Sequence, residues 1–330
     1  MSECLGHPTL GYYRTRDPLG TAGDFTTAPE VSQIFGEMLG LFLIDRWEAI
    51  GRPPRFHLVE LGPGRGTLFA DILRIARIRP DFLKAGHGHL IETSPALRAR
   101  QQALLREHAR RIAWAETLER VEDDAPLLLI ANEFFDALPI RQYVKTAAGW
   151  CERLVGLDGD SFTYVLQPTR ALLPHGEEGA VLETRPSDEP ILRAIAARIR
   201  RHGGAALIID YGFEGPAFGD TFQAVRGHRF ADPLADPGSA DLTAHVDFGH
   251  LASLARLEGA RCFGPAGQGE FLTRLGLDLR VAQLTQAHPE RAAEFAAARE
   301  RLTAPAQMGS VFKVLCIAGE GSPLPPGFAA

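Results

Sequence analysis

Apolar residues along this chain fall into two alternating patterns. Short continuous runs, each about the length of a buried strand, lie at residues 56–61, 87–92, 112–114, 126–131, 205–210, 261–263 and 311–318. Between many of them, apolar residues recur at helical spacing, as at 68–76, 95–110, 189–202 and 248–258. Continuous apolar runs are typical of parallel strands buried on both faces. Their alternation with helices predicts an α/β fold with a mostly parallel sheet.

The segments outside this alternation predict the rest of the organisation. Residues 1–30 are rich in Gly, Pro, Thr and Asp and predict an ordered loop, and residues 31–50 predict an amphipathic helix with one apolar face. We therefore expect residues 1–54 to pack on a core formed by 55–145 and 188–265. Two alternating segments around Asp158-Gly159 predict a hairpin insertion within 146–187.

The second half of the chain has two further interruptions. Residues 219–247 are polar, rich in Pro and Gly, and predict a long functional loop. Helices expected at 270–275 and 279–302 place a helical segment at 266–304, which we interpret as a lid over the site or a partner-binding segment. Residues 305–330 contain the final strand and a tail whose composition is that of a disordered end.

A glycine-rich turn follows the strand at 56–61. The sequence ELGPGRG places Glu60 at the end of that strand and Gly62, Pro63, Gly64 and Gly66 ahead of a helix. Glycine permits a tight turn at positive φ and close approach of the backbone to a ligand, and the amides at the helix start face that ligand. The unit predicts a nucleotide site. The alternative is a glycine turn that only tightens the packing of strand against helix.

The spacing of the glycines and the carboxylate of Glu60 favour one kind of nucleotide. A dinucleotide fingerprint reads G-x-G-x-x-G, whereas the third glycine here comes one residue early. A carboxylate just before the loop is a poor neighbour for a pyrophosphate and suits a cation such as the α-amino group of S-adenosylmethionine. ELGPGRG therefore resembles the first motif of the class I methyltransferases.

Further carboxylates follow the other strands of the predicted sheet. Glu92 ends the strand at 87–92, where a doubly wound sheet meets the ribose of its ligand; the alternative is a charge at the start of the next helix. Glu116 follows the strand at 112–114, where many such enzymes hold the adenine amino group. We assign Glu92 and Glu116, together with Asn132, to cofactor binding.

Residues 132–139, NEFFDALP, follow the buried run at 126–131. Glu133 and Asp136 thus lie at the carboxyl end of a central strand, where ligands bind in open α/β sheets. We predict that both are catalytic and lie next to the methyl donor; the alternative is that they are helix caps. Asp24 and Glu30 are two further catalytic candidates, although Glu30 is equally explained as a residue that begins a helix.

Composition narrows the classes of function. The chain has 330 residues, 45% of them hydrophobic, and a formal net charge of −6 without a dense basic stretch, which disfavours nucleic acid as a partner. Its four cysteines are far apart and indicate a reducing compartment. No apolar run has the length of a leader or a membrane span, so we expect a cytoplasmic protein that does not insert into membranes. We predict no metal, because His228, Asp241, His245 and Asp247 match no familiar ligand spacing.

Several long motifs together resemble one family. They are GYY (11–13), DPLGTAGDFTTAPE (17–30), VELGPGRGTL (59–68), ETSP (92–95), ANEFFDALP (131–139), IIDYG (208–212), AVRGHRFADPLADPGSADLTAHVDF (224–248) and MGSVFKVL (308–315). With them the chain looks like the MidA-type class I methyltransferases, the family that includes the mitochondrial respiratory complex I assembly-factor methyltransferase. It departs from the family at the N-terminus, where members usually have additional residues before GYY.

The resemblance implies a class I, Rossmann-like fold with a seven-stranded, mostly parallel sheet and helical and hairpin insertions. It also implies S-adenosyl-L-methionine as methyl donor and a protein arginine as acceptor, on a subunit of respiratory complex I or its bacterial counterpart. An arginine side chain is a permanent cation that carboxylates such as Glu133 and Asp136 hold by bidentate hydrogen bonds. In-line methyl transfer to a guanidinium nitrogen would then depend mostly on positioning.

Three other functions fit parts of the same sequence. They are a non-catalytic assembly or scaffold protein that retains the fold, a methyltransferase that acts on a small molecule, and a nicotinamide-dependent oxidoreductase, which the glycine spacing disfavours. The acceptor, the number of methyl groups added and the oligomeric state are left open by the sequence.

Overall fold

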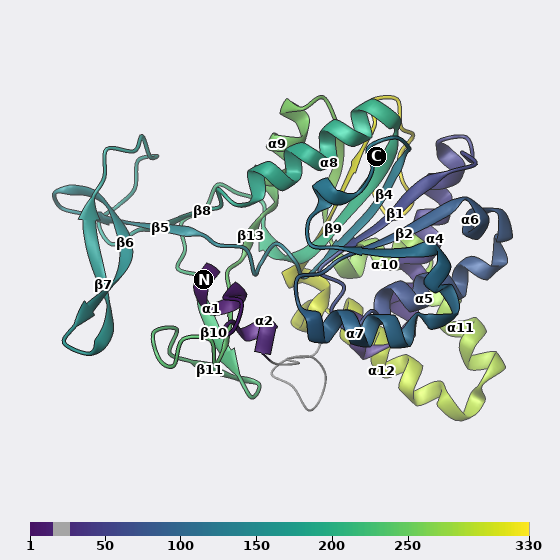
Figure 1. The fold of residues 1–330 in the computed structure, drawn as a ribbon, viewed down its shortest axis with the longest axis horizontal. Coiled ribbons are helices and arrows are strands. Elements are labelled where there is room, and N and C mark those ends of the chain that lie inside the picture. Colours follow the sequence, from purple (N-terminus) through teal and green to yellow (C-terminus); the bar gives the residue numbers. More distant parts are fainter. Residues whose placement is uncertain (16–26, 330) are drawn as a thin grey trace.

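The central element of the structure, a computed structural model that describes residues 1–15 and 27–329, is a mixed sheet (Figure 1). Among these residues, seven strands lie in the order β14-β15-β9-β4-β1-β2-β3, and β13 pairs with β9 as an eighth. The strands from β9 to β3 are mutually parallel, and β15 is antiparallel to both of its neighbours. The predicted seven-stranded, mostly parallel sheet is therefore confirmed. Its strands are β1 (Phe56–Leu61), β2 (Gly86–Ile91), β3 (Ile112–Ala115), β4 (Leu127–Asn132), β9 (Gly204–Phe213), β13 (Val246–Asp247), β14 (Arg261–Gly267) and β15 (Phe312–Ala318).

Helices cover both faces of this sheet. Alternate residues of the buried strands point to opposite faces, so that Leu58 and Leu128 join one apolar core while Val59 and Leu129 join another. The second core is completed by α8 (Asp188–His202) and α9 (Phe248–Leu257), and the first by α4 (Gln33–Ala49), α5 (Thr67–Ile75), α10 (Gln268–Leu275), α11 (Leu277–Ala287) and α12 (Ala292–Thr303). The remaining helices are α1 (Ser2–Gly6), α2 (Tyr12–Thr15), α3 (Ala28–Val31), α6 (Pro80–Ala85) and α7 (Pro95–Leu104).

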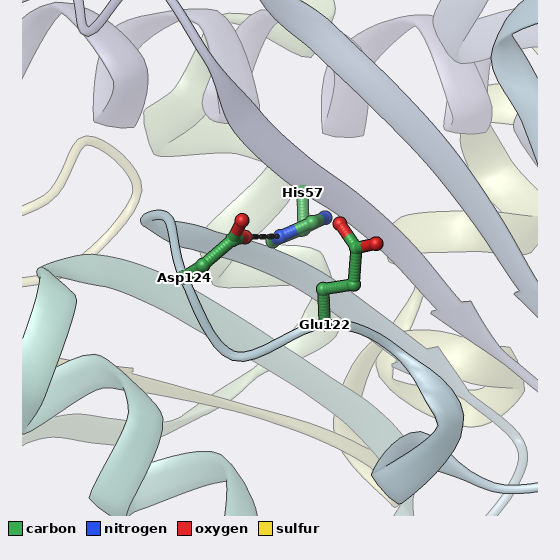
Figure 2. Close-up of side chains that lie close together, drawn as sticks. All are labelled: His57, Glu122 and Asp124. Carbon is green, nitrogen blue, oxygen red and sulfur yellow. Dashed lines mark hydrogen bonds and ion pairs between the residues drawn. The ribbon is translucent and has the colours of Figure 1, made fainter.

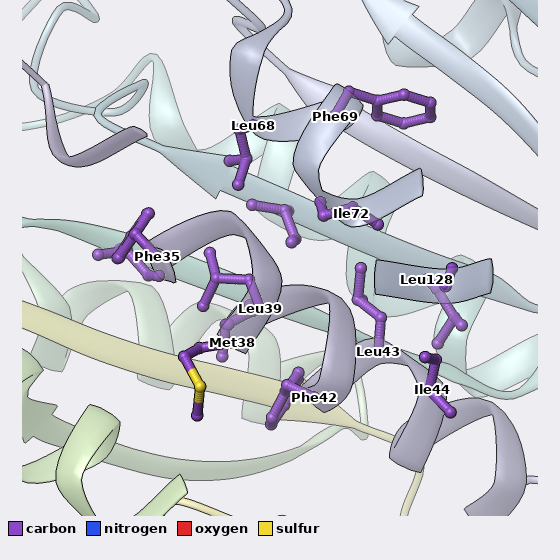
Figure 3. Close-up of a cluster of buried hydrophobic side chains, with 14 of the residues drawn as sticks. Phe35, Met38, Leu39, Phe42, Leu43, Ile44, Leu68, Phe69, Ile72 and Leu128 are labelled. Carbon is purple, nitrogen blue, oxygen red and sulfur yellow. The ribbon is translucent and has the colours of Figure 1, made fainter. Parts of the chain in front are cut away.

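Helix α4 lies inside the first core, and the prediction that it is amphipathic was wrong. Leu39 and Leu43 lie on the side of α4 that faces α5 in Figure 3, and Phe42 contacts Phe271 of α10 with ring centroids 5.9 Å apart. Even Glu37 is buried, where it forms ion pairs with arginines of α5 and α11. Elements pack on nearly all sides of the helix, so no polar face was needed to meet water.

The helices at the end of the chain pack beside α4. The single helix predicted at 279–302 is broken at His288 into α11 and α12, because Pro289 removes the N–H that a continuous helix would need. No residue between 266 and 304 lines the large cavity described below. The segment therefore does not cover that cavity as a lid, and its role in partner binding stays a prediction.

Two small sheets extend from the core. The predicted hairpin is present and is part of a four-stranded sheet in the order β7-β6-β5-β8, with β5 (Arg141–Thr146), β6 (Gly149–Asp158), β7 (Ser161–Pro168) and β8 (Val181–Thr184). The predicted long loop at 219–247 contains a three-stranded sheet instead, in the order β11-β10-β12, with β10 (Gln223–Arg226), β11 (Arg229–Ala231) and β12 (Asp241–Thr243). These strands are too short and too polar for the sequence pattern to reveal them.

The tail after β15 is ordered, contrary to the prediction of a disordered end. Phe328 is buried against the rings of Phe263 and Phe271, with centroid distances of 6.5 and 5.2 Å, and the carbonyl of Pro323 accepts a hydrogen bond from Arg46. One aromatic anchor is enough to fix a segment whose composition is otherwise that of a linker. Across residues 1–15 and 27–329, none of the helices has the length and apolar character needed to cross a membrane.

The tail gives a prediction about stability. Replacing Phe328 by Ala removes a side chain that is 7% exposed, and we expect a loss of about 3 kcal/mol in the free energy of unfolding. Leu324→Ala, at a position 43% exposed in the same tail, is the matched control and should cost less than about 1 kcal/mol. Urea denaturation measures both changes, and equal effects of the two variants would contradict the anchoring role of Phe328.

Candidate functional site

A cavity of about 760 Å³ opens at the carboxyl ends of the parallel strands. Its walls come from the glycine loop after β1, the ends of β2, β3 and β4, and the end of β9. The N-terminal segment, the three-stranded sheet and the start of β15 complete it through Ser2, Leu5, Tyr13, Gln223, Asp241, Thr243 and Phe312. In an open α/β sheet this edge is the expected place for a ligand.

The glycine loop takes the conformation that its sequence predicts. Gly62, Gly64 and Gly66 have φ values of 62°, 52° and 84°, which residues with a Cβ seldom adopt. Gly62, Pro63 and Gly64 line the cavity, as predicted for cofactor contacts, whereas Gly66 does not. Gly66 is instead the left-handed residue that precedes α5, and a Cβ there would lie 3.2 Å from Gln101. Its role is to end the loop and make room for Gln101.

Two buried acceptor atoms at the cavity lack a hydrogen-bond donor among the residues that the structure describes. They are Oε2 of Glu60, at the end of β1, and Oδ1 of Asn132, at the end of β4. Burial, with Asp71 and Glu92 nearby, raises the pKa of Glu60 to about 8. Buried acceptors without donors are costly unless a ligand supplies the donor. A cationic ammonium group satisfies this requirement, so these two residues fit the amino group of S-adenosylmethionine.

Glu92 lines the same cavity immediately after β2. Its Oε1 accepts a hydrogen bond from the amide of Ser94 at 2.7 Å and its Oε2 one from Nε2 of Gln101 at 3.2 Å. The same Nε2 donates to the carbonyl of Gly64 at 2.7 Å and so links the glycine loop to Glu92. Glu92 thus contacts the start of α7 and also lines the cavity, so its position suits both interpretations, and ribose binding stays a prediction. Gln101 was missed by the sequence analysis because it lies within a helix, without a motif.

Glu116 also lies where the sequence predicted it. It follows β3 directly, lines the cavity and is exposed to solvent. The predicted cofactor residues Glu60, Glu92, Glu116 and Asn132 therefore come together at one cavity from four neighbouring strands.

Glu133 and Asp136 follow β4 at the same edge. Glu133 has a φ of 51°, an uncommon backbone conformation for a residue other than glycine. Its Oε1 accepts hydrogen bonds from the backbone amide of Ala28 at 3.2 Å and from the side-chain Nδ2 of Asn132 at 3.1 Å. Burial and the nearby Asp136 raise the pKa of Glu133 to about 8. Oδ2 of Asp136 accepts a hydrogen bond from the hydroxyl of Tyr211 at 2.5 Å, and burial raises the pKa of Asp136 as well.

The turn that carries these two carboxylates is held by Asp210, a residue that the sequence analysis did not assign. Oδ2 of Asp210 accepts hydrogen bonds from the amides of Phe135 and Asp136 at 3.0 and 3.1 Å, and Oδ1 accepts one from the amide of Tyr211 at 3.0 Å. The side chain is fully buried, and burial raises its pKa well above the usual range. Its place at the end of the strand next to β4 is the sequence signal that should have identified it.

Tyr13 and Asp241 bring two distant segments to the cavity. The Tyr13 hydroxyl donates to Oδ1 of Asp241 at 2.7 Å, although 228 positions in the sequence separate the two residues. Burial is the main cause that raises the pKa of Tyr13 well above its usual value, and Asp241 and Asp136 add to it. Tyr211 and His245 line the cavity nearby and contact each other edge to face. Long-range contacts of this kind left no local signal in the sequence.

Glu30 lines the cavity from the first turn of α3. It accepts a hydrogen bond from the hydroxyl of Thr67 at 2.7 Å and lies 3.6 Å from Nη1 of Arg65 in the glycine loop. It is therefore both a helix-start residue and a residue of the cavity wall. Asp24, the other catalytic candidate, lies outside the described residues.

The four residues weighed as metal ligands have separate roles. Asp241 and His245 line the cavity, Asp247 caps α9 by accepting a hydrogen bond from the amide of His250 at 2.9 Å, and His228 lies in the exposed turn between β10 and β11. They do not form one ligand set.

A different cluster, His57, Glu122 and Asp124, has side chains that point toward one another at the opposite end of β1 (Figure 2). Nε2 of His57 lies 2.9 Å from Asp124 and its Nδ1 lies 2.9 Å from His89, while Arg55 donates to both carboxylates at 2.7 and 2.5 Å. Both ring nitrogens and both carboxylates thus already have partners. We interpret the cluster as an ion-pair network that joins β1 to the loop before β4.

Comparisons with known proteins agree with this site. The chain matches the family model of S-adenosyl-L-methionine-dependent methyltransferases over residues 38–266. It is 40% identical to the protein arginine methyltransferase NDUFAF7 homolog, mitochondrial, of Drosophila melanogaster, over 96% of this chain and 80% of the relative. It is 39% identical to the protein arginine methyltransferase NDUFAF7, mitochondrial, of Homo sapiens, over 86% of this chain and 70% of the relative.

A solved structure agrees with the fold and with the kind of cofactor. A crystal structure from Burkholderia thailandensis, bound to S-adenosyl-homocysteine, superposes with a TM-score of 0.86 at 27% identity, over 99% of this chain and 88% of that chain. The glycine loop, the unpaired acceptors at the cavity and these matches lead to one conclusion: the chain belongs to the S-adenosyl-L-methionine-dependent methyltransferase family and uses S-adenosyl-L-methionine as its cofactor.

Proposed function

We propose that this protein methylates an arginine side chain of another protein. The observation that carries the proposal is the pair of carboxylates of Glu133, which is half-buried, and Asp136, which is buried; both line the same cavity as the glycine loop. The two curated relatives named above are protein arginine methyltransferases, which supports the same acceptor. A guanidinium is a permanent cation, so buried carboxylates can hold it, whereas they disfavour neutral and anionic acceptors.

One end of the cavity suits the cofactor, which supplies a methyl group bonded to a cationic sulfur. We assign the unpaired acceptors of Glu60 and Asn132 to its ammonium group, Glu92 to the ribose hydroxyls and Glu116 to the adenine. Gly62, Pro63 and Gly64 let the backbone approach it closely, since no Cβ intervenes at the two glycines.

The other end suits the acceptor. Oε1 of Glu133 is held by two donors, and no donor to its Oε2 is found among the residues that the structure describes, so Oε2 is the atom that we expect to face the guanidinium. The hydroxyl of Tyr211 fixes the orientation of Asp136. Because its pKa is about 8, Glu133 is protonated at pH 7 until a cation arrives. It then ionises, orients the guanidinium and can take up the proton that the methylated nitrogen later loses. Glu30 and Asp24 stay candidates for the same role.

The proposal for the partner rests on the family that the sequence motifs resemble. We propose that the acceptor is a subunit of respiratory complex I or of its bacterial counterpart, in line with the assembly role of the family that the motifs resemble. We also propose a location in the bacterial cytoplasm, which agrees with the four free cysteines.

The direct test of the function is transfer of a labelled methyl group. Purified protein and labelled S-adenosylmethionine are added to a lysate of a host that lacks its own copy, and the labelled bands are hydrolysed. We expect label in one protein as methylarginine. Label in another amino acid or in a small molecule would refute the arginine assignment, and no label despite confirmed cofactor binding would favour a scaffold protein.

The first prediction for this site concerns the glycine loop. Gly64→Val places a branched side chain where the backbone should touch the cofactor, and we expect affinity for S-adenosylhomocysteine to fall by about tenfold or more, measured by calorimetry. Gly51→Val is the matched control, because Gly51 also has a positive φ, of 86°, but stands in open space away from the cavity. Equal affinity of the two folded variants would remove Gly64 from the site.

The second prediction concerns pH. In the free protein Glu60 holds a proton below about pH 8, and a cationic amino group favours the ionised carboxylate. Affinity for S-adenosylhomocysteine should therefore rise as the pH increases from 6 to 8, by up to about tenfold per unit, with a proton released on binding. Glu60→Gln should flatten this dependence. Calorimetry in buffers of different ionisation enthalpy measures the number of protons released on binding. If the affinity of the wild-type protein did not change with pH, Glu60 would not bind the amino group.

The third prediction separates binding from turnover. Glu133→Gln keeps the size of the side chain but cannot ionise, so we expect cofactor affinity to stay within about twofold while methyl transfer falls by roughly a hundredfold or more. Glu122→Gln, in the distant ion-pair network, is the control and should keep wild-type activity. If Glu133→Gln transferred methyl groups at the wild-type rate, Glu133 would have no part in the reaction.

A further inference from the structure

The four-stranded sheet formed by β5, β6, β7 and β8 projects away from the body of the protein as an arm, at the left of Figure 1. No residue from 141 to 184 lines the cavity, so the site described above gives the arm no task. Within the arm, β7 is the edge strand and is hydrogen-bonded to β6 alone.

One face of the β6–β7 ribbon is largely apolar and exposed. Val155 pairs with Tyr164 and Leu157 with Phe162, and directly paired residues point to the same face. Leu166, two positions beyond Tyr164, shares that face. Arg153, which pairs with Leu166, lies on this face as well, and its guanidinium is 5.3 Å from the centroid of the Tyr164 ring. Alternation of this kind normally buries one face of a ribbon against a core, yet the five apolar side chains are between 39% and 68% exposed.

Along β7, successive residues alternate between bonding to β6 and directing their backbone N–H and C=O groups to the free edge. Asp158 pairs with Ser161 across the two-residue turn at Gly159, whose φ is 60°. In a two-residue hairpin that first pair exchanges hydrogen bonds, and the bonding direction then alternates along the strand. Ser161, Thr163 and Val165 therefore bond to β6, whereas Phe162, Tyr164 and Leu166 direct their N–H and C=O groups to the open side.

This edge has almost none of the features that prevent exposed strand edges from pairing with other strands. The strand reads SFTYVLQP and carries no charged side chain, and its one proline, Pro168, is the last residue; it shares the outward phase but lies beyond Leu166. Natural proteins usually protect a free edge with lysines, inward-pointing charges, bulges or a short strand. An uncharged edge next to an exposed apolar face is typical of a strand that pairs with another strand.

We propose that two copies of this chain pair β7 against β7, antiparallel about a two-fold axis at Tyr164. In this register Tyr164 faces Tyr164 of the second copy, Phe162 faces Leu166, and Thr163 faces Val165. Every pair is apolar or neutral, so the symmetry brings no like charges together.

The register follows from the phase of the edge. A shift by one residue would set an outward-bonding residue against an inward-bonding one and break the ladder. A shift by two residues keeps the phase but leaves one of the three outward residues without a partner. The register centred on Tyr164 uses Phe162, Tyr164 and Leu166 in both copies.

A second copy explains the arm better than an acceptor protein does. An acceptor is bound only during turnover, whereas a second copy presents the same uncharged edge and is always available to pair with β7. Pairing of one edge buries less than the roughly 800 Å² per partner of a standard interface, so the dimer should be reversible. The proposal does not depend on the methylated substrate.

The first test is the mass of the full chain in solution. Sedimentation velocity from low to high micromolar concentration should show a shift from the monomer, 35.9 kDa, to twice that mass. Tyr164→Lys places two ammonium groups at the axis, and we expect the dissociation constant of the dimer to rise at least tenfold. Phe230→Lys, at an aromatic residue that is 81% exposed on β11, is the matched control and should leave the dimer intact. A monomer at all concentrations, or a dimer insensitive to Tyr164→Lys, would overturn the proposal.

The second test checks the register itself. With Tyr164→Cys, the two Cα atoms lie about 5.5 Å apart, which suits a disulfide. Thr163→Cys places its two Cβ atoms about 7–8 Å apart, which does not. Mild oxidation should therefore cross-link the first variant into a covalent dimer and leave the second, like the wild type, unlinked. Absence of the Tyr164→Cys cross-link, or equal cross-linking of both variants, would rule out this register.

Discussion

The buried carboxylate of Asp210 is the interaction on which the catalytic edge depends. It accepts the amides of Phe135 and Asp136 at 3.0 and 3.1 Å, and so bends the chain sharply just after β4. This bend holds Glu133 at a positive φ and turns both Glu133 and Asp136 toward the cavity. Without a buried acceptor at this place, the two amides would be unsatisfied inside the protein, a cost of about 1–3 kcal/mol each. The hydrogen bonds to Asp210 on the neighbouring strand β9 thus offset the backbone strain at Glu133. Strain of this kind is typical of functional positions.

The cavity that results collects negative charge in a place with little water. Glu60, Glu92, Glu133 and Asp136 line it, Asp210 is buried next to the backbone of Asp136, and burial raises the pKa of each. Such carboxyls are partly neutralised by protons while the cavity has no cation in it, because ionisation inside a low-dielectric region is costly. The cofactor and the proposed acceptor are both cations. When these cations bind, the carboxyls lose their protons and become ionised. The cavity therefore favours cationic ligands over neutral ligands of the same shape.

The sequence predicted those parts of the molecule that depend on local pattern. Buried runs identified the strands, and glycine spacing with Glu60 identified the loop and its ligand class, because both signals lie within a few consecutive residues. Prediction failed where distant segments decide the outcome. The all-round burial of α4 depends on helices more than 220 positions away, the order of the tail depends on Phe328 meeting Phe271, and Tyr13 reaches Asp241 across 228 positions. Gly66 was assigned to the cofactor because spacing cannot separate a glycine that touches a ligand from one that ends the turn.

A crystal structure of the protein with S-adenosylhomocysteine and an arginine-containing acceptor peptide would show where both ligands bind. We expect the guanidinium within hydrogen-bond distance of both Glu133 and Asp136, and the amino group of the cofactor beside Glu60 and Asn132, with the turn after β4 unchanged. A peptide bound with its arginine outside this cavity, or a cofactor amino group far from Glu60, would refute arginine methylation at this site.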